Sequence, residues 1–218
     1  MNLEQTLELV VGILNERGLS YALAGGLAAS LYRDELRVTQ DIDIVLISDG
    51  NTLELAESLL KELKLKPRLA RKADLEGGPL FAIKRNNTPP LIVAGRDPQK
   101  KEIIGVDFIL PAMPWANAAV ERAKSNQIDF GFGKVPTISV EDLIVAKLWA
   151  ICGSKKREKD VDDLRSIFSV GHELDCSYIV GHMQEHLLRI PESLEGDVPE
   201  VLVNAAKRIK RATRPKVR

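Results

Sequence analysis

The chain has 218 residues, of which 44% are hydrophobic and 28% charged, with 31 basic and 31 acidic side chains. This composition is typical of a globular protein and excludes a disordered chain, a collagen-like repeat and a coiled-coil rod. No apolar run approaches the roughly 18 residues that predict a membrane-spanning helix. The first residues also lack a basic segment followed by an apolar one. We therefore expect a cytoplasmic protein in which Cys152 and Cys176 are reduced thiols.

The charge is unevenly distributed along the chain. Residues 207–218 contain seven basic side chains and no acidic one, so the rest of the chain carries a net charge of −7. An acidic body with a basic tail is not typical of a protein that binds nucleic acid over its whole surface. The tail alone could contact phosphate groups.

The first part of the chain mixes helical and strand patterns. Leu3, Leu7, Val10 and Leu14 recur at helical spacing, whereas the β-branched run 42–47 predicts a buried strand. On the same grounds we expect helices over residues 3–17, 27–32, 52–63 and 115–124, strands over residues 21–24, 42–47, 80–83, 91–93 and 103–110, and a hairpin over residues 127–138.

From residue 139 onward the pattern is helical. Ser139, Glu141 and Asp142 resemble the start of a helix, with acids in its first turn. Further helices are expected over residues 160–168, 177–188 and 198–209. The sequence therefore predicts an α/β (α+β) protein. A mixed sheet with flanking helices would occupy residues 1–138, and a C-terminal helical region with a basic tail would occupy residues 139–218.

Two glycines, Gly25 and Gly26, stand between a predicted strand and a predicted helix. Without side chains they would let a phosphate approach the backbone, where a helix start offers unpaired N–H groups and a positive dipole end. The alternative is a tight strand-to-helix turn with no ligand.

Asp41 and Asp43 stand two residues apart at the start of the strand 42–47. Residues at this spacing in a strand point to the same face, so the two carboxylates lie side by side. Like charges this close repel each other, and burying them is costly unless a positive charge lies between them. Carboxylate oxygens suit Mg²⁺, which usually also binds phosphate oxygens of a substrate. Alternatively, Asp41 caps a turn and Asp43 is solvated at a strand end.

Asp107 interrupts the apolar run 103–110, which reads as a central strand. If this strand pairs next to the one that carries Asp41, Asp107 supplies a third carboxylate. Two metal ions held in this way could activate an attacking oxygen and stabilise a leaving pyrophosphate. The alternative is an edge strand on which Asp107 faces water.

The pattern Gly25-Gly26, then Asp41-Ile42-Asp43, then Asp107 resembles the nucleotidyltransferase superfamily. Arg37-x-Thr39-x-Asp41-x-Asp43, with Lys147-Leu148-Trp149-Ala150 and Asp160-Val161-Asp162-Asp163-Leu164 further on, is similar to the branch that includes the AbiEii-type toxins. The resemblance spans about residues 20–168.

The resemblance implies Mg²⁺-dependent transfer of a nucleoside monophosphate from an NTP to an acceptor, with Mn²⁺ as an alternative cation. It implies that Asp41, Asp43 and Asp107 hold the metal, with Asp107 also acting as general base. Lys147 would offset charge on the phosphates. Nucleotide binding would involve the following residues: Gly25, Gly26, Arg37, Thr39 and Asp160.

Three of these residues keep alternatives open. Arg37 is either a phosphate clamp or a surface charge. Lys147 lies on an apolar helical face and either reaches phosphate or extends its ammonium to water. Asp160 and Asp163 share a helix face, where they would orient Lys147 or an acceptor; as the alternative, they are a helix cap and a surface acid.

One residue departs from the superfamily pattern. Leu27 follows the glycine pair where a Ser or Thr hydroxyl often reaches phosphate, which leaves that task to backbone N–H groups, with help from Ser30, Arg37 and Thr39. Loss of the hydroxyl also suits a catalytically degenerate nucleotide-binding or regulatory protein, as one half of a toxin–antitoxin pair.

The acceptor is open between RNA, a protein side chain and a small hydroxylated molecule, and the basic tail favours RNA. An antitoxin partner is expected from the toxin branch, and no membrane partner is expected. His182 and His186 stand at i, i+4 as in a zinc pair. No third ligand is evident, and Glu185 between them does not stand in an HExxH pattern, so we do not expect a zinc site.

Overall fold

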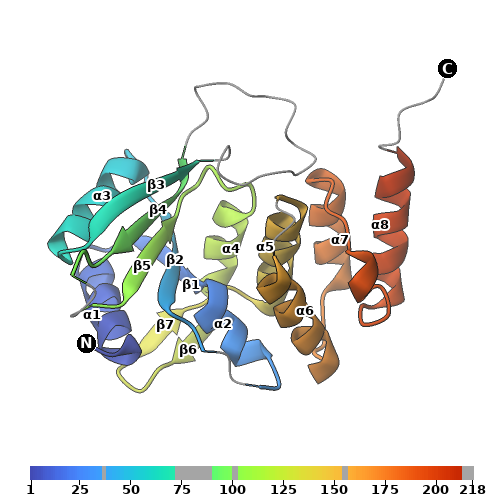
Figure 1. The fold of residues 1–218 in the computed structure, drawn as a ribbon, viewed down its shortest axis with the longest axis horizontal. Helices are drawn as coiled ribbons and strands as arrows, with labels where there is room; N and C mark the ends of the chain where they lie inside the picture. Colours follow the sequence, from blue (N-terminus) through green and yellow to red (C-terminus); the bar gives the residue numbers. More distant parts are fainter. Residues whose placement is uncertain (36–37, 72–89, 100–102, 154–156, 213–218) are drawn as a thin grey trace. The chain divides into compact units, whose positions relative to one another are not determined.

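The computed structural model describes residues 1–218 except 36–37, 72–89, 100–102, 154–156 and 213–218 (Figure 1). The described residues group into two compact units. One unit lies within residues 1–31, 36–74 and 85–139, and the other within residues 32–35 and 140–218. The first unit holds the sheet, and the second is helical.

The sheet of the first unit has five strands in the order β1-β2-β5-β4-β3. β2 and β5 are parallel, whereas all other neighbours are antiparallel, so the sheet is mixed, as predicted. Its strands are β1 (Ser20–Ala24), β2 (Asp41–Ile47), β3 (Lys66–Arg71), β4 (Pro90–Arg96) and β5 (Gly105–Ile109).

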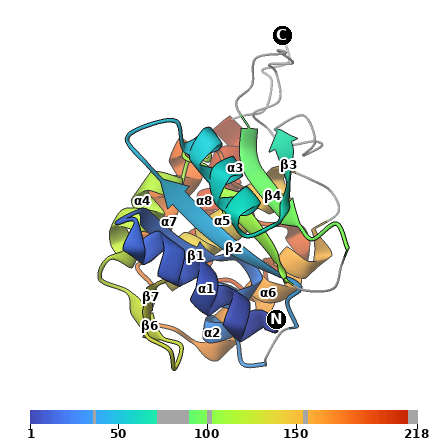
Figure 2. The ribbon, with the colours of Figure 1, turned by 90° about the vertical axis from the view of Figure 1, so that its left-hand side faces the viewer.

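Helices α1 (Leu3–Glu16) and α3 (Thr52–Glu62) cover one face of this sheet (Figure 2). A capping box between Asn2 and Gln5 fixes the start of α1. The buried leucines and valines of the two helices pack against every second residue of β2. These strand residues are Ile42, Ile44 and Leu46. Because side chains alternate along a strand, Asp41, Asp43 and Val45 point to the opposite face.

A helix of the same unit packs on part of that opposite face. Helix α4 (Ala116–Ala123) contacts β1 and β2, and its buried side chains are mostly alanines, which allow a close approach. Val45 is fully buried, whereas Asp41 and Asp43, nearer the start of β2, are half-buried. The acidic end of β2 is therefore less buried than the middle of the strand.

The expected hairpin forms from β6 (Gln127–Asp129) and β7 (Lys134–Pro136). The chain then runs along β1, where the Ile138 N–H donates to the carbonyl of Leu23 at 3.0 Å. Helix α2 (Gly25–Tyr32) starts at the end of β1 without a loop. The glycine pair is thus the first turn of that helix, two residues earlier than predicted.

The sequence pattern missed one strand of the sheet. β3 contains charged residues and a proline and has no apolar run, because among the described strands it is the last in the order and pairs with β4 alone. Lys66 and Arg68 are exposed along it, as is common at sheet edges. The strand predicted over residues 80–83 lies outside the described residues.

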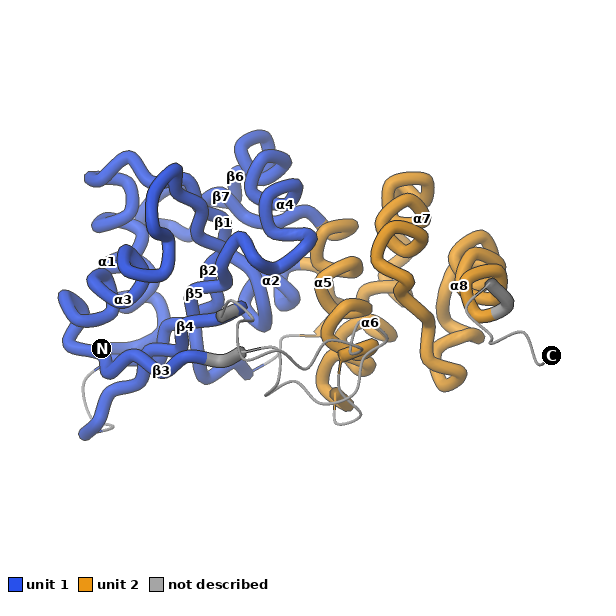
Figure 3. Tube along the Cα trace, turned by 90° about the horizontal axis from the view of Figure 1, so that it is seen from above, with its two compact units in different colours: residues 1–31, 36–74, 85–139 blue, residues 32–35, 75–84, 140–218 orange. Residues whose placement is uncertain are grey.

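The described residues of the second unit form four α-helices, with a short 3₁₀ helix η2 (Glu192–Leu194) before the last of them. Figure 3 shows this unit in orange. α5 packs against α6 and α7, and α7 packs against α8. None of the described helices is long and apolar enough to cross a bilayer. The helices are α5 (Val140–Gly153), α6 (Glu158–Val170), α7 (Cys176–Glu185) and α8 (Glu200–Ala212).

The two acids predicted for the first turn of α5 attach α7 to it. Glu141 accepts a hydrogen bond from the Asp175 N–H at 3.2 Å, and Asp142 accepts one from the Tyr178 hydroxyl at 2.5 Å. Both acids are buried, so these bonds compensate their desolvation.

Candidate functional site

The parallel pairing of β2 with β5 brings three carboxylates onto one face of the sheet. In this register Asp43 lies opposite Asp107, and Asp41 lies opposite Gly105. Paired residues of adjacent strands share a face. β5 is an interior strand with β2 and β4 on either side. The alternative of an edge strand for Asp107 is therefore wrong.

A guanidinium lies between these carboxylates. Arg96, at the end of β4, makes a two-pronged ion pair with Asp107, in which Nη2 lies 2.9 Å from Oδ2 and Nη1 bonds Oδ1. The same Nη2 lies 3.1 Å from Oδ2 of Asp41. Paired geometry of this kind is characteristic of strong arginine–carboxylate contacts. The glycine at position 105 makes room for it, because a Cβ there would approach Nη1 of Arg96 to 2.9 Å.

Arg96 is a site residue that the sequence did not reveal. At the end of an apolar strand a lone arginine reads as an ordinary strand terminus. Only the antiparallel register of β4 on β5, which sets Gly95 opposite Val106, brings the next residue toward the acids.

The electrostatics of the site follow from burial and from this ion pair. Burial raises the pKa of Asp107, the nearby charge of Asp41 raises it further, and Arg96 opposes both effects. Hydrogen bonding to Asp107 raises the pKa of Arg96, and the charges of Asp41 and Asp43 contribute to this. The side chain of Asp107 is 14% exposed and that of Asp41 is 37% exposed. The acids therefore repel each other and attract a cation.

The donor set fits a hard divalent cation. Three carboxylates from two adjacent strands offer the oxygen ligands that Mg²⁺ prefers. The guanidinium of Arg96 occupies a cation's place between two of them. In the described part of the chain, the acids do not form a cluster whose ligand atoms all lie within 4.8 Å of one another. A guanidinium is larger than Mg²⁺, so the acids would have to draw together around the smaller ion.

Gly25 is required by Asp43. Its backbone has a φ of +63°, and a Cβ at this position would lie 1.8 Å from Oδ2 of Asp43. A side chain there would be strained by the backbone and would displace the carboxylate. The glycine at the end of β1 thus makes room for a carboxylate, a role that the sequence did not suggest.

The residues predicted to assist phosphate binding are placed as follows. The Thr39 hydroxyl donates to the carbonyl of Asp41 at 3.1 Å, and the Ser30 hydroxyl donates to the carbonyl of Gly26 at 3.1 Å. Gly26 is buried in the first turn of α2. Arg37 lies outside the described residues.

Lys147 belongs to a second, buried cluster of charges inside the helical unit. Its Nζ lies 3.1 Å from Asp160 and 2.5 Å from Asp163, and the residue is only 4% exposed. Arg33 also bonds Asp163 and lies 3.0 Å from Asp162. The alternatives in which Lys147 extends to water and Asp163 is a surface acid are therefore wrong. Asp160 and Asp163 both contact the ammonium.

Comparison with known proteins points to one family. A family model described as "Nucleotidyl transferase AbiEii toxin, Type IV TA system" matches residues 12–214. Among curated proteins, none matches the sequence. Among solved structures, an antigenic nucleotidyltransferase-like protein from Paracoccidioides brasiliensis is similar with a TM-score of 0.53 and 18% identity, over 94% of this chain and 92% of that one.

Two further solved structures are similar at lower scores. The antibiotic-resistance factor ANT(2'')-Ia has a TM-score of 0.49 and 15% identity, over 86% of this chain and 95% of that one. A putative nucleotidyltransferase from H. pylori has a TM-score of 0.47 and 15% identity, over 96% of this chain and 93% of that one.

Replacing Gly25 with alanine tests the steric demand of Asp43. We expect Gly25→Ala to lower the free energy of unfolding by about 1–3 kcal/mol, because a positive φ and a blocked Cβ position both oppose it. Gly12→Ala in α1 is the matched control, since nothing lies within 4 Å of its Cβ position and alanine favours a helix. Urea unfolding followed by circular dichroism measures both variants. Equal stability of the two would contradict the predicted clash.

Removing the buried ammonium tests the second cluster. We expect Lys147→Met to lower the free energy of unfolding by about 3 kcal/mol, because it leaves buried carboxylates less compensated. Lys124→Met is the control, since that lysine and its partner Glu121 are largely exposed and such pairs contribute about 0–1 kcal/mol. If thermal and urea unfolding give the same loss for both, the buried ion pairs do not stabilise this unit.

Proposed function

The chain belongs to the AbiEii nucleotidyl transferase toxin family and is a nucleotidyltransferase. On that basis we propose that its carboxylates support the transfer of a nucleoside monophosphate from an NTP to an acceptor, with release of pyrophosphate. The observation that carries this proposal is the shared face of Asp41, Asp43 and Asp107 on adjacent parallel strands. Their excess negative charge suits a reaction in which a cation draws phosphates to the sheet.

In this proposal Asp41, Asp43 and Asp107 hold Mg²⁺, with Mn²⁺ as the alternative. The cation supplies positive charge to the phosphate oxygens and favours ionisation of the attacking group. Asp107 also acts as general base.

The start of α2 binds phosphate in this proposal. The helix begins at Gly25, next to Asp43, and the first N–H groups of a helix have no partners within it. Such N–H groups favour anions. Gly26, Thr39 and Arg37 are proposed to add contacts. For Lys147 and Asp160, a part in nucleotide binding requires the ammonium to exchange a carboxylate partner for a phosphate oxygen.

Arg96 acts as an internal counter-ion in the same proposal. Its guanidinium neutralises part of the charge of Asp41 and Asp107 while no metal ion is bound. It has to leave them when a divalent cation takes its place. A released guanidinium suits phosphate, whose oxygens match its fork of donors.

The second candidate function is a nucleotide-binding or regulatory protein that has lost catalysis. Leu27 after the glycine pair favours it, as do the hydroxyls of Ser30 and Thr39, which donate to backbone carbonyls. The carboxylates and Arg96 favour the active enzyme, because a binding module has no need of three acids on one face.

The acceptor and partners follow the family and the charge. We propose a cytoplasmic toxin that pairs with an antitoxin and has RNA as its favoured acceptor, with a protein side chain or a small molecule as alternatives. In α8, Lys207 and Lys210 lie 3.6 Å and 3.3 Å from Glu195 and Glu192. The RNA proposal therefore depends on the net basic charge of residues 207–218 as a whole.

A transfer assay with Asp43→Asn tests the proposed reaction. We expect the variant to fold and to lose Mg²⁺-dependent transfer of an α-³²P-labelled nucleotide, because one ligand charge is removed. Labelled RNA, protein and small-molecule fractions identify the acceptor. Asp49→Asn, in an exposed turn, is the control and should retain activity. Unchanged transfer by Asp43→Asn would exclude this site. NTP binding without transfer by the natural chain would favour the second candidate function.

Metal titration of Arg96→Ala tests the counter-ion role. We expect the nucleotide-free variant to bind Mn²⁺ about tenfold more tightly, because a competing charge at contact distance is removed. Mn²⁺ electron paramagnetic resonance measures the affinity without any need for activity. Arg68→Ala, on the exposed edge strand β3, should bind as the natural chain does. Unchanged or weaker binding by Arg96→Ala would rule out competition by its guanidinium.

A further inference from the structure

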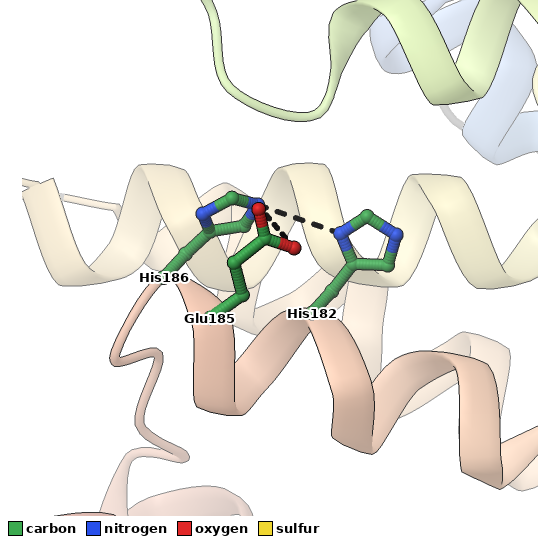
Figure 4. Close-up of side chains that lie close together, drawn as sticks. All are labelled: His182, Glu185 and His186. Atoms are coloured by element: carbon green, nitrogen blue, oxygen red, sulfur yellow. Dashed lines mark hydrogen bonds and ion pairs between the residues drawn. The ribbon is translucent and has the colours of Figure 1, made fainter.

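The last turn of α7 brings three metal-ligand side chains together (Figure 4). His182, Glu185 and His186 stand at i, i+3 and i+4, a spacing that places side chains on one face of a helix. Their ligand atoms all lie within 4.8 Å of one another. Nδ1 of His182 lies 3.4 Å from Nε2 of His186, which lies 3.8 Å from Oε2 of Glu185. Glu185 therefore lies where a third ligand beside the histidine pair would be needed.

The distance between the two ring nitrogens matches two ligands of one metal ion. Zinc binds imidazole nitrogen at about 2.0–2.1 Å, so two such ligands at the tetrahedral angle lie about 3.3–3.4 Å apart. The Glu185 carboxylate lies slightly further from His186, at 3.8 Å, and its side chain is 68% exposed. Small rotations of this side chain can therefore bring an oxygen to the metal ion that the two rings would share. A direct N–H···N hydrogen bond between the rings has the same spacing, and the experiment below distinguishes the two.

The surroundings hold the rings in place. The Tyr178 ring packs on the His182 ring with centroids 4.5 Å apart, and its hydroxyl is bonded to Asp142 of α5. The His186 side chain is only 10% exposed.

We propose that His182, Glu185 and His186 form a binding site for a transition metal of the Zn²⁺ class, with three protein ligands and a fourth position open to solvent. Two histidines with one carboxylate are a known three-ligand set for zinc. Nitrogen ligands favour such ions over Mg²⁺, so this site differs in selectivity from the three aspartates. It lies in the helical unit and does not depend on the proposed transfer reaction.

The metal would fix the C-terminal end of α7. His186 follows the last residue of the helix, and the next residue, Leu187, has a φ of +55°. This conformation is uncommon for a residue other than glycine. A metal bridging the last helical turn to His186 would hold the chain in this bend, from which it continues toward η2 and α8.

Titration of the full-length chain tests the proposal. The chain is stripped with a chelator and titrated with Zn²⁺ and with Co²⁺ in excess Mg²⁺, which occupies hard carboxylate ligands. We expect one Zn²⁺ per chain by calorimetry, and the visible absorption of four-coordinate Co²⁺. His186→Ala should weaken Zn²⁺ binding at least about tenfold. Removing a residue that only hydrogen-bonds to a metal ligand already costs about 10–100-fold in metal affinity, and His186 would be a ligand itself. Zn²⁺ should raise the melting temperature of the natural chain and not that of His186→Ala.

Matched variants separate the outcomes. His172→Ala removes the remaining histidine, whose Nε2 lies 2.7 Å from the Tyr32 carbonyl, and it should bind Zn²⁺ unchanged. Asp43→Asn should also bind unchanged, which separates this site from the transfer site. If His186→Ala does not fold, His182→Gln replaces it, because that residue is less buried. The proposal would be overturned if the natural chain did not bind Zn²⁺, or if His186→Ala or His182→Gln bound it as tightly as the natural chain. Either result would assign the contact between the two rings to a hydrogen bond.

Discussion

Repulsion among three carboxylates is the constraint on which the sheet unit depends. Two unit charges 4 Å apart near a protein surface interact by on the order of 4 kcal/mol, so a third acid beside two others needs a cation. Arg96 supplies that charge from the neighbouring strand, with Nη2 at 2.9 Å from Asp107 and 3.1 Å from Asp41. The fold thus contains the positive charge that makes this arrangement stable before any ligand binds.

The sheet order makes the arrangement inevitable once the strands pair. One face of β2 packs its branched residues under α1 and α3, and this fixes the direction of the alternate residues. The parallel neighbour β5 then sets Asp107 beside Asp43. The end of β1 reaches the same point, and only a glycine at position 25 leaves space for the Asp43 carboxylate. Packing on one face of the sheet therefore determines the chemistry on the other.

The helical unit also holds several acids close together, and there Asp163 and its cationic partners are largely buried. Its cluster combines Lys147 and Arg33 with three aspartates, one of which, Asp163, is fully buried. Breaking such a pair leaves a buried charge without compensation. The ion pairs therefore act as a packing constraint on α5 and α6. The acids at the start of α5 attach α7 in the same unit.

The sequence by itself determined the local features, because strand and helix periodicity depend only on neighbouring residues. It predicted the mixed sheet and the helical second part. It also predicted the common face of Asp41 and Asp43. Only the tertiary structure decided what lies beside them, because strand order and register depend on packing over the whole chain. Arg96 and the pairing of Asp43 with Asp107 follow from that register.

Other features depend on side-chain directions that periodicity does not give. The burial of Lys147 requires α6 to pack on α5 with its acids turned inward. At α7 the sequence did contain the signal, since Glu185 lies three residues after His182 on the same helix face. Only the tertiary structure decided that the two rings and the carboxylate meet, with the Tyr178 ring packed on His182, because spacing along a helix fixes only where a side chain begins.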